Sequence, residues 1–424
     1  MPPVQPALGL SEHVVPEDQS ALGPLGPAER RLMWVLASTT FVAMVGVSII
    51  VPFLPLFAQS LGASGVVMGF IFSVFSLVRS ITMPVVGPLS DRHGRKPFIW
   101  TGLLGYSATA LLLLTVSSPL GLIMNRAFQG LFGAMVLPVS LALVADVIPK
   151  GREGRVMGFF NMALLLGFGL GPPLGGFVYD HLGLDANFYL QAGLSFLSLL
   201  AVLVWVREPP ALKRSHRGRG LDFSLLADRD FLGIFLARFG AAAAMGCFMA
   251  FVPLLFQRYT LSNSAVGLFF GVNVLVMVAM QIPSGRLADR LPRVPLAFVG
   301  VFGSGVCKFL LPWAGGLPGL LVLSVSEGFF AGLALPALTA LAVSRGRALG
   351  HGMGRVMADF TMAMSLGILV GPVLGGWLVD VSGVAASFWL AGGAAMAGSL
   401  GLVALTRSSS APATPPPAAP EESA

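Results

Sequence analysis

Six charged residues stand inside long apolar runs of this 424-residue sequence: Arg79, Arg126, Arg238, Lys308, Glu327 and Asp359. If these runs cross a membrane, each charge costs at least a few kcal/mol at the bilayer centre and is therefore a candidate functional residue. A carboxyl group partly removed from water has its pKa raised toward neutrality, which suits a residue that takes up and later releases a proton. The chemistry predicted for this set is therefore the uptake and release of protons and, for the arginines, the binding of an anionic substrate.

Glu327 is the strongest candidate for a proton-carrying group. It lies about nine residues into the tenth apolar run, near the middle of a membrane span. An alternative explanation is structural, because a salt bridge to Lys308 across the hairpin of the ninth and tenth runs would account for the same residue.

Asp359 and the arginines Arg79 and Arg238 each allow two interpretations. Asp359 follows Arg355 by one helical turn, so an i,i+4 ion pair explains it without further function. Arg79 lies late in the second run and Arg238 early in the seventh, which places both in the halves expected to face the cytoplasm, where they could bind an anionic substrate or pair with Asp359. Four intramembrane cations outnumber two acids, which argues against a lipophilic cation as the ligand.

The composition predicts that membrane helices position these charges. The chain is 55% hydrophobic and 11% charged, with a mean hydropathy of +0.83, whereas soluble domains average about 45–50% and about 25%. We therefore expect an all-α membrane protein embedded in a lipid bilayer. The net charge of +7 gathers in short loops between apolar runs, which indicates membrane topology rather than binding to nucleic acid.

The sequence carries no pattern typical of an enzyme. Cys247 and Cys307 both lie in apolar runs, and the five histidines show no ligand spacing. Motifs of zinc proteases, P-loop proteins and serine hydrolases are absent. We expect no metal, no cofactor and no enzymatic activity.

Twelve runs are long enough to span a bilayer, which takes roughly 20 apolar residues. They are placed at 34–57, 64–86, 98–116, 119–145, 154–179, 186–206, 230–256, 264–287, 295–313, 318–343, 353–380 and 384–405. The predicted organisation is a disordered tail (1–29), a six-helix half (30–206), a hinge loop (207–229), a second six-helix half (230–407) and a second disordered tail (408–424).

The distribution of basic residues predicts the orientation in the membrane. Of the 26 Lys and Arg residues, four lie well inside spans and only Arg258 lies in an odd-to-even loop; the others lie in the tails, in the even-to-odd loops or at the span ends beside those loops. Because such residues concentrate on the cytoplasmic side, both termini are expected to be cytoplasmic, in the inner membrane of a cell.

The two halves are copies of one another. At an offset of 198 residues, Pro55 matches Pro253 and Pro138 matches Pro336; later the offset becomes 200, and Asp180 matches Asp380. Two repeats related by an axis along the membrane normal predict a cavity between them and alternating access to that cavity. We expect spans one, two, four and five, with their counterparts seven, eight, ten and eleven, to line it.

A glycine-rich pattern in span five repeats in span eleven. Glycines 167, 171 and 175 recur every four residues, which forms a smooth helical stripe that another helix can approach closely. Pro172 removes a backbone donor and is expected to bend the helix. The full pattern is Gly158, Gly167, Gly171, Pro172, Gly175 and Gly176.

The polar stretch after span two resembles the signature loop of the major facilitator superfamily. Its residues are Gly87, Asp91, Arg92, Gly94 and Arg95, and a degenerate copy after span eight keeps Gly285, Asp289 and Arg290. On physical grounds we expect Gly87 to allow close helix packing, Asp91 to accept hydrogen bonds from a neighbouring helix N-terminus, and Arg95 to pair with Asp146. The resemblance implies a cytoplasmic gate latch that holds the outward-open state; a plain topology signal is the alternative.

Two further patterns resemble the drug:proton antiporters of that superfamily. Span four contains Arg126-x-x-Gln129-Gly130, similar to an element associated with proton coupling, and span five carries the glycine pattern. The resemblance implies that Arg126 exchanges partners during transport, whereas a simpler explanation is hydrogen bonding to carbonyl groups. The membrane-embedded acid that several multidrug members carry in span one is missing here.

The sequence therefore predicts a twelve-helix, proton-coupled exporter of small hydrophobic compounds, acting as a monomer. Glu327, Arg126 and Asp359 are the candidates for proton coupling. Arg79, Gln129, Asn161 and Arg238 are the candidates for the substrate cavity. A carrier of metabolites or organic anions and a non-transporting membrane sensor remain as alternatives.

Overall fold

The computed structural model describes residues 27–147, 153–206, 224–350 and 353–406, and these form helices and turns without a β-strand. Within these ranges, twelve helical segments are long and apolar enough to cross a membrane. The predicted all-α architecture of two six-helix repeats is confirmed. Most of the predicted tails and hinge lie outside the described residues, although α1 already begins at Pro27 and η4 (Ser224–Ala227) precedes the second half.

The first half consists of α1 (Pro27–Ile50), η2 (Val51–Phe53), α2 (Leu54–Ser60), α3 (Gly65–His93), α4 (Lys96–Leu112), η3 (Leu113–Thr115), α5 (Pro119–Val147), α6 (Glu153–Leu182) and α7 (Leu184–Trp205). The second half consists of α8 (Arg229–Arg258), α9 (Asn263–Arg290), α10 (Arg293–Leu310), η5 (Leu311–Trp313), α11 (Leu317–Ala348), α12 (Met353–Ser382) and α13 (Val384–Leu405). We call the face where α1 begins and α13 ends the termini face, and the opposite face, where α3 and α9 begin, the distal face.

The first span is interrupted where its repeat partner is continuous. Pro52 and Pro55 each remove a backbone donor, and the chain passes from α1 through the single 3-10 turn η2 into α2. The counterparts in α8 are Ala250 and Pro253, and α8 runs unbroken past its one proline. A single proline is therefore tolerated at this depth, and the second one accompanies the break.

Helix α3 is longer than the predicted second span of 64–86. It continues through Gly87 to His93, so most of the signature stretch is helical rather than a loop. Gly94 and Arg95 make the turn to α4, and the φ of 93° at Gly94 is a conformation that favours glycine. Beyond the apolar run the helix is continued by polar residues that suit an aqueous surface.

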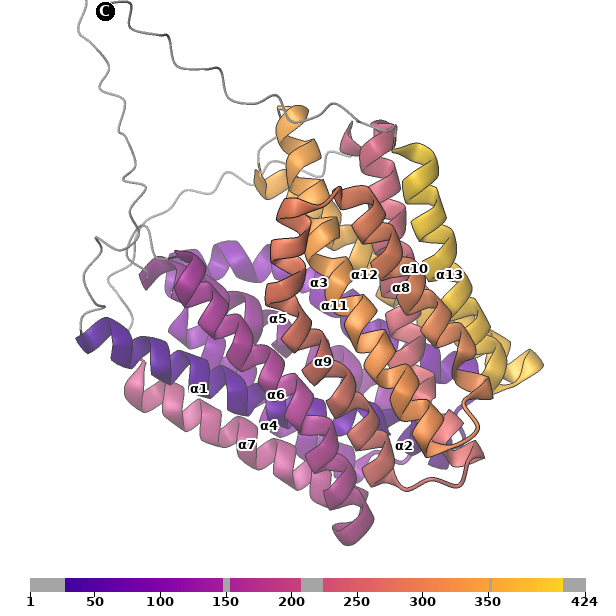
Figure 1. Ribbon diagram of the computed structural model, residues 1–424. Helices are drawn as coiled ribbons and strands as arrows, with labels where there is room; N and C mark the ends of the chain where they lie inside the picture. The colour runs from indigo at the N-terminus through magenta and orange to yellow at the C-terminus, as the bar shows by residue number, and fades with distance from the viewer. Residues whose placement is uncertain (1–26, 148–152, 207–223, 351–352, 407–424) are drawn as a thin grey trace, which may run out of the picture.

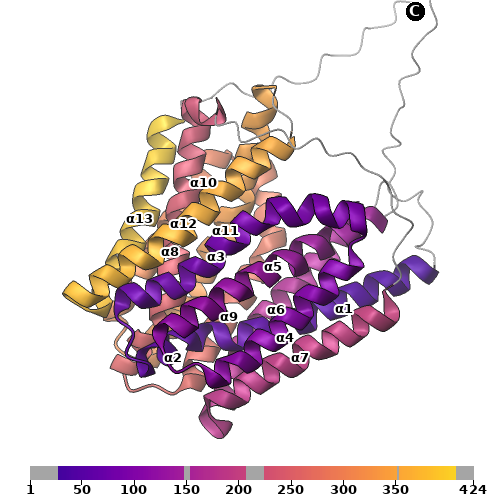
Figure 2. The same cartoon turned by 180° about the vertical axis from the view of Figure 1, so that it is seen from behind.

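The two halves meet mainly through two helix pairs, α3 with α12 and α6 with α9. Figure 1 shows α6 beside α9, and Figure 2 shows α3 beside α12. Both pairs touch near the distal face, where a Cβ placed on Gly69 would lie 2.2 Å from the carbonyl oxygen of Pro372, and one on Gly267 would lie 2.3 Å from that of Pro172.

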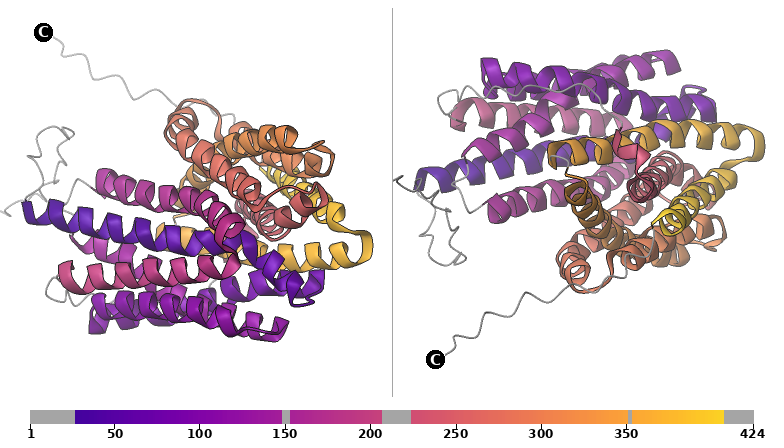
Figure 3. Two further views of the ribbon diagram at one scale, coloured as in Figure 1. Left: turned by 90° about the horizontal axis from the view of Figure 1, so that it is seen from below. Right: turned by 90° about the horizontal axis from the view of Figure 1, so that it is seen from above.

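The halves diverge toward the termini face. A Cβ added to Gly87 on α3, Gly158 on α6 or Gly285 on α9 would meet no atom of the described residues within 4 Å. Figure 3 shows the two groups of helices steeply inclined to one another. The molecule is thus closed on the distal face and parted on the termini face.

Candidate functional site

A central cavity of about 180 Å³ lies between the two halves. Its walls come from the middle of their helices, which places the cavity near the centre of the membrane span. The apolar wall residues are Met44, Val47, Val51, Phe72, Phe75, Gly133, Leu137, Phe168, Met245, Gly246, Met249 and Ile368. The polar wall residues are Ser76, Arg79, Tyr106 and Arg126.

Arg126 reaches the cavity from α5 and is 5% exposed. Its guanidinium donates to the side-chain oxygen of Gln129 at 2.6 Å and to the carbonyl of Ile71 at 3.4 Å. The group also stacks on Phe75, 4.4 Å from the ring centroid. Arg126 is therefore held by neutral partners, and no acidic side chain among the described residues forms an ion pair with it.

Arg79 enters the cavity from α3. The close packing of α3 on α5 positions it, because a Cβ on Gly130 would lie 2.5 Å from the carbonyl of Phe75 and 3.3 Å from the amide of Arg79. Its Nε atom is buried and has no hydrogen-bond partner. A buried donor without a partner loses its interaction with water and gains nothing in return, so a ligand acceptor would stabilise it.

The charge of the cavity wall is positive. Arg79 and Arg126 are its cationic members, and no carboxylate lines it in the part of the chain that the structure describes. In a site walled by phenylalanine and methionine, two guanidinium groups favour a ligand with negative charge and disfavour a cation.

Glu327 lies outside this cavity, inside the second half. It accepts hydrogen bonds from Lys308 and Ser304 (3.0 Å) at Oε1, and from Asn273 at Oε2. Lys308 also donates to Ser304 at 2.7 Å and lies over the ring of Phe248. The salt bridge considered as the structural alternative for Glu327 is present, within a network that satisfies both of its oxygens.

The other candidates for the cavity are not brought into it. Gln129 accepts a hydrogen bond from Arg126 but does not itself line the cavity. Asn161 is exposed and does not line the cavity either. Arg238 contacts Met364 and the ring of Phe360 within the second half. Asp359 is buried, 7% exposed, and is also absent from the cavity wall.

The signature stretch forms a tight cluster at the termini face of the first half. Arg95 pairs with Asp146 at 2.5 Å and with Asp91 at 2.8 Å, and Lys96 donates to the carbonyl of Leu203. The expected Arg95–Asp146 pair is therefore present. Among the described residues, no helix N-terminus donates to Asp91 as expected, and the expected close packing at Gly87 is not found, since a Cβ there would meet no atom within 4 Å.

The degenerate copy at the end of α9 makes fewer contacts among the described residues. Asp289 and Arg290 are exposed, and Arg92 in the first copy is exposed as well. The second copy ends at Leu291 in an extended conformation, without the left-handed turn that Gly94 makes. The two copies therefore differ in structure at the turn that follows the helix, where the first copy has Gly94 and the second has no glycine.

The glycine pattern divides into two contact surfaces. Gly167, Gly171 and Gly175 pack against α1, where an added Cβ would lie 2.7 Å from the carbonyl of Phe41, 1.9 Å from Ser48 and 2.3 Å from the carbonyl of Ile49, respectively. Gly176 instead faces α9 of the other half, 2.4 Å from the carbonyl of Asn263 by the same measure. The predicted close approach of another helix is confirmed, and α6 stays continuous through Pro172.

Sequence reasoning missed several residues that the structure brings to these sites. Tyr106 lines the cavity, and Asn273 and Ser304 complete the shell of Glu327. Each is a polar group in an apolar run, which is a signal that could have identified it. The aromatic and methionine wall had no such signal, because those residues are frequent throughout the sequence.

Comparison with known proteins agrees with the fold and the repeat. The sequence profile of the Major Facilitator Superfamily matches residues 36–233 and again 234–424. An uncharacterised transporter of this type from Methanocaldococcus jannaschii is 30% identical over 370 residues, covering 85% of this chain and 94% of the relative. The multidrug resistance protein MdtG of Klebsiella pneumoniae is 28% identical and covers 79% of this chain and 84% of its own length.

Among solved structures, the nucleoside transporter NupG superimposes with a TM-score of 0.76 at 14% identity, covering 89% of this chain and 100% of that one. At this identity the likeness concerns the fold alone. The profile match extends over both halves, and the relative from Methanocaldococcus jannaschii shares most of its length with this chain. The chain belongs to the Major Facilitator Superfamily of membrane transporters.

Proposed function

We propose that this protein is a proton-coupled exporter of small hydrophobic compounds that carry an anionic group. The observation that carries the proposal is the cavity wall, which combines phenylalanine and methionine side chains with Arg79 and Arg126 and has no carboxylate among the described residues. The apolar wall accommodates varied ligand bodies, because methionine and phenylalanine adapt to different shapes. The arginines select for a carboxylate, sulfonate or similar group by charge-assisted hydrogen bonds.

The direction of transport rests on topology. The basic residues gather at the termini face, so we assign that face to the cytoplasm. The cavity then loads from the cytoplasm in the conformation seen here, which is parted on that face. The name of the related MdtG protein, a multidrug resistance protein, agrees with export.

Proton coupling is assigned to Glu327. In the present conformation its carboxylate is stabilised by Lys308, Ser304 and Asn273, which is the arrangement expected after a proton has been released inside. Protonation from the opposite side would neutralise Glu327 and weaken its attraction to Lys308. The helices α9, α10 and α11, which share this network, would then be free to repack in the second half.

The cycle follows from these assignments. A substrate enters from the termini face and binds with its anionic group at Arg79, where the buried Nε lacks a partner. The halves rock, the distal face opens and the substrate leaves. Glu327 takes up a proton from the outside, and the return to the present conformation releases that proton to the cytoplasm.

The test is transport into proteoliposomes under an imposed pH gradient. Three fluorescent compounds with one apolar body, bearing a carboxylate, no charge or a quaternary ammonium group, would be compared. We expect uptake of the carboxylate compound to exceed that of the ammonium compound about tenfold or more, and to collapse when a protonophore removes the gradient. Preference for the ammonium compound would contradict the charge assignment, whereas uptake that ignores the gradient would contradict proton coupling alone.

A further inference from the structure

Two aspartates connect the halves at the distal face, each in the same way. Asp180, in the last turn of α6, reaches the start of α9 in the other half, and Asp380, in the last turn of α12, reaches the start of α3. Asp380 accepts the backbone N–H groups of Gly65 at 2.6 Å and Val66 at 2.9 Å. The two contacts are related by the sequence repeat, so the distal face carries a matched pair.

Asp180 makes the same backbone contacts and two more. It accepts the backbone N–H groups of Asn263 at 3.1 Å and Ser264 at 2.7 Å. The side chains of the same two residues donate as well, at 2.9 Å and 2.5 Å. The equivalent positions at the start of α3 are glycine and valine, which have no side-chain donor.

The helix starts leave these amides available. The first N–H groups of a helix have no partner within it. Ser64 caps the amide of Val67 in α3, and Ser262 caps the amide of Ala265 in α9. The two preceding amides of each helix remain, and in both helices an aspartate from the opposite half accepts them, where a carboxylate is also favoured by the helix dipole.

The backbones come close enough for this contact only because glycine stands at both crossings. A Cβ on Gly176 would lie 2.4 Å from the carbonyl of Asn263, and one on Gly376 would lie 2.0 Å from that of Gly65. Each aspartate lies one turn after such a glycine, on the same approach. The contact therefore depends on the closed arrangement of the two halves and has to break when they part at this face.

We infer that Asp180 and Asp380 are gate-positioning residues, a pair of distal latches that hold the transporter closed at this face during its cycle. Both residues are exposed to solvent, so water replaces the lost hydrogen bonds when the latches open. The latches thus favour one conformation without trapping it. This inference rests on membership of a transporter family and is independent of the substrate proposed above.

The experiment measures conformation directly, by distances between spin labels in the full-length protein in lipid nanodiscs. Cys247 and Cys307 are buried, so introduced cysteines are labelled selectively. One pair, Leu182→Cys with Gln257→Cys, reports on the distal face, and the other, Leu89→Cys with Ala358→Cys, reports on the termini face. These four positions are exposed.

Removing the charge of one latch aspartate should increase the population with a long distal-face distance and, to the same extent, the population with a short termini-face distance. In Asp180→Asn or Asp380→Asn we expect the ratio of distal-open to distal-closed molecules to rise roughly three- to tenfold, since each aspartate accepts at least two charge-assisted hydrogen bonds at an exposed site. The double variant should show about the product of the two effects. The distal distance should lengthen and the termini distance should shorten together.

Two further variants keep the result interpretable. Asp185→Asn removes an exposed carboxylate from the start of α7 on the same face and should leave both distances unchanged. Ser264→Ala keeps the backbone contacts, removes one side-chain donor and should give a smaller shift than Asp180→Asn. A lower melting temperature with no reciprocal change in the two distances would overturn the inference, as would an equal shift in Asp185→Asn.

Discussion

Glu327 and Gln129 occupy the same position in the two halves of the molecule. They are 198 residues apart, and the glycine that follows each one packs against the carbonyl oxygen of Phe75 in the first half and of Asn273 in the second, positions that are also 198 apart. Both side chains accept a hydrogen bond from a cation of their own half. The repeat therefore places a neutral acceptor beside the cavity and an ionised one in the second half.

This relationship supplies a control for the function of Glu327. The residue equivalent to Lys308 in the first half is Ala110, so Glu327→Gln with Lys308→Ala gives these two positions the side chains that the first half has. Glu327→Gln alone leaves a buried lysine without its counter-charge, and we expect it to destabilise the protein by about 3–5 kcal/mol. The double variant should recover most of that stability.

Recovery of stability would separate the two explanations of Glu327. If Glu327 carries the proton, the double variant should fold and bind substrate, yet substrate accumulation should no longer follow the pH gradient. If the Glu327–Lys308 pair is only structural, gradient-driven transport should return along with stability. Thermal unfolding and proteoliposome uptake, measured on the same preparations, decide between these outcomes.

Transport should depend on the ion pair between Arg95 and Asp146 rather than on either residue alone. The two side chains are 2.5 Å apart, so reversing either charge alone places like charges in contact and should lower transport about tenfold or more. Exchanging the two residues, Arg95→Asp with Asp146→Arg, should recover part of the activity; recovery stays incomplete because Asp91 would then face a second carboxylate. Losses that add up in the exchange variant would show that the pair has no joint function.

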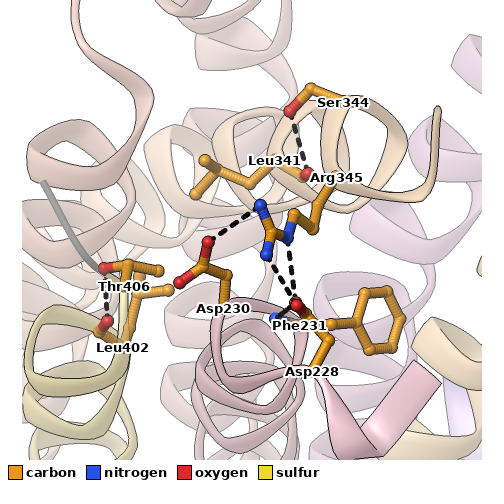
Figure 4. A network of polar contacts seen from close by, with 8 residues as sticks. All are labelled: Asp228, Asp230, Phe231, Leu341, Ser344, Arg345, Leu402 and Thr406. Carbon is orange, nitrogen blue, oxygen red and sulfur yellow. Dashed lines mark hydrogen bonds and ion pairs between the residues drawn. The ribbon is translucent and has the colours of Figure 1, made fainter. Parts of the chain in front are cut away.

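The termini face of the second half contains a contact that acid should weaken. Asp228 caps α8 through the amide of Phe231, and Arg345 of α11 lies between Asp228 and Asp230, as Figure 4 shows. The hydrogen bonds from Arg345 lower the pKa of Asp228 below its ordinary value. A lowered pKa in the folded state means that the contact stabilises the protein above the unfolded-state pKa of about 3.9, and that this stability is lost as the pH falls through the folded-state pKa.

We therefore expect Asp228→Asn, which can still cap the helix, to cost about 0.5–1 kcal/mol at neutral pH, a modest figure because the pair is partly exposed. Asp228→Ala should cost about 1 kcal/mol more, through loss of the cap. The difference between wild type and Asp228→Asn should shrink below about pH 4 in thermal unfolding. A difference that stays constant down to about pH 3 would show that the charge contributes nothing.

Alanine substitutions in the glycine pattern of α6 should have different effects, depending on which helix each glycine contacts. Gly167→Ala pushes against α1 within the same half and should lower the melting temperature. Gly176→Ala pushes against α9 across the interface and should instead favour opening at the distal face. Gly158→Ala meets nothing within 4 Å and should change neither property. Equal effects of all three on stability would contradict this division.

The sequence predicts the architecture well because hydropathy and charge asymmetry act locally. The span count and the partners of Arg95 and of Lys308 follow from spacing along one run or one hairpin, and the repeat follows from matching residues at a constant offset. The extension of α3 through the signature was not predicted, because its polar residues are as compatible with a helix in water as with a loop.

Only part of the cavity wall could be predicted from the sequence, because Arg79 alone of the four residues expected in the cavity lines it. Arg79 and Arg238 occupy similar places in their spans, yet only Arg79 lines the cavity, because the packing of Gly130 on α3 fixes its position. The partners of Asp180 and Asp380 depend on how two rigid halves dock, and no local pattern encodes that arrangement.

In the proposed function, the cavity recognises a negative group through Arg79. The most direct measurement is the affinity of purified protein in nanodiscs for two ligands that share one apolar body, one with a carboxylate and one with the methyl ester. Arg79→Gln should weaken binding of the carboxylate about tenfold or more and change binding of the ester less than about threefold. Arg238→Gln, which removes an arginine outside the cavity wall, serves as the matched control. Equal losses for both ligands in Arg79→Gln, or none for either, would contradict the account.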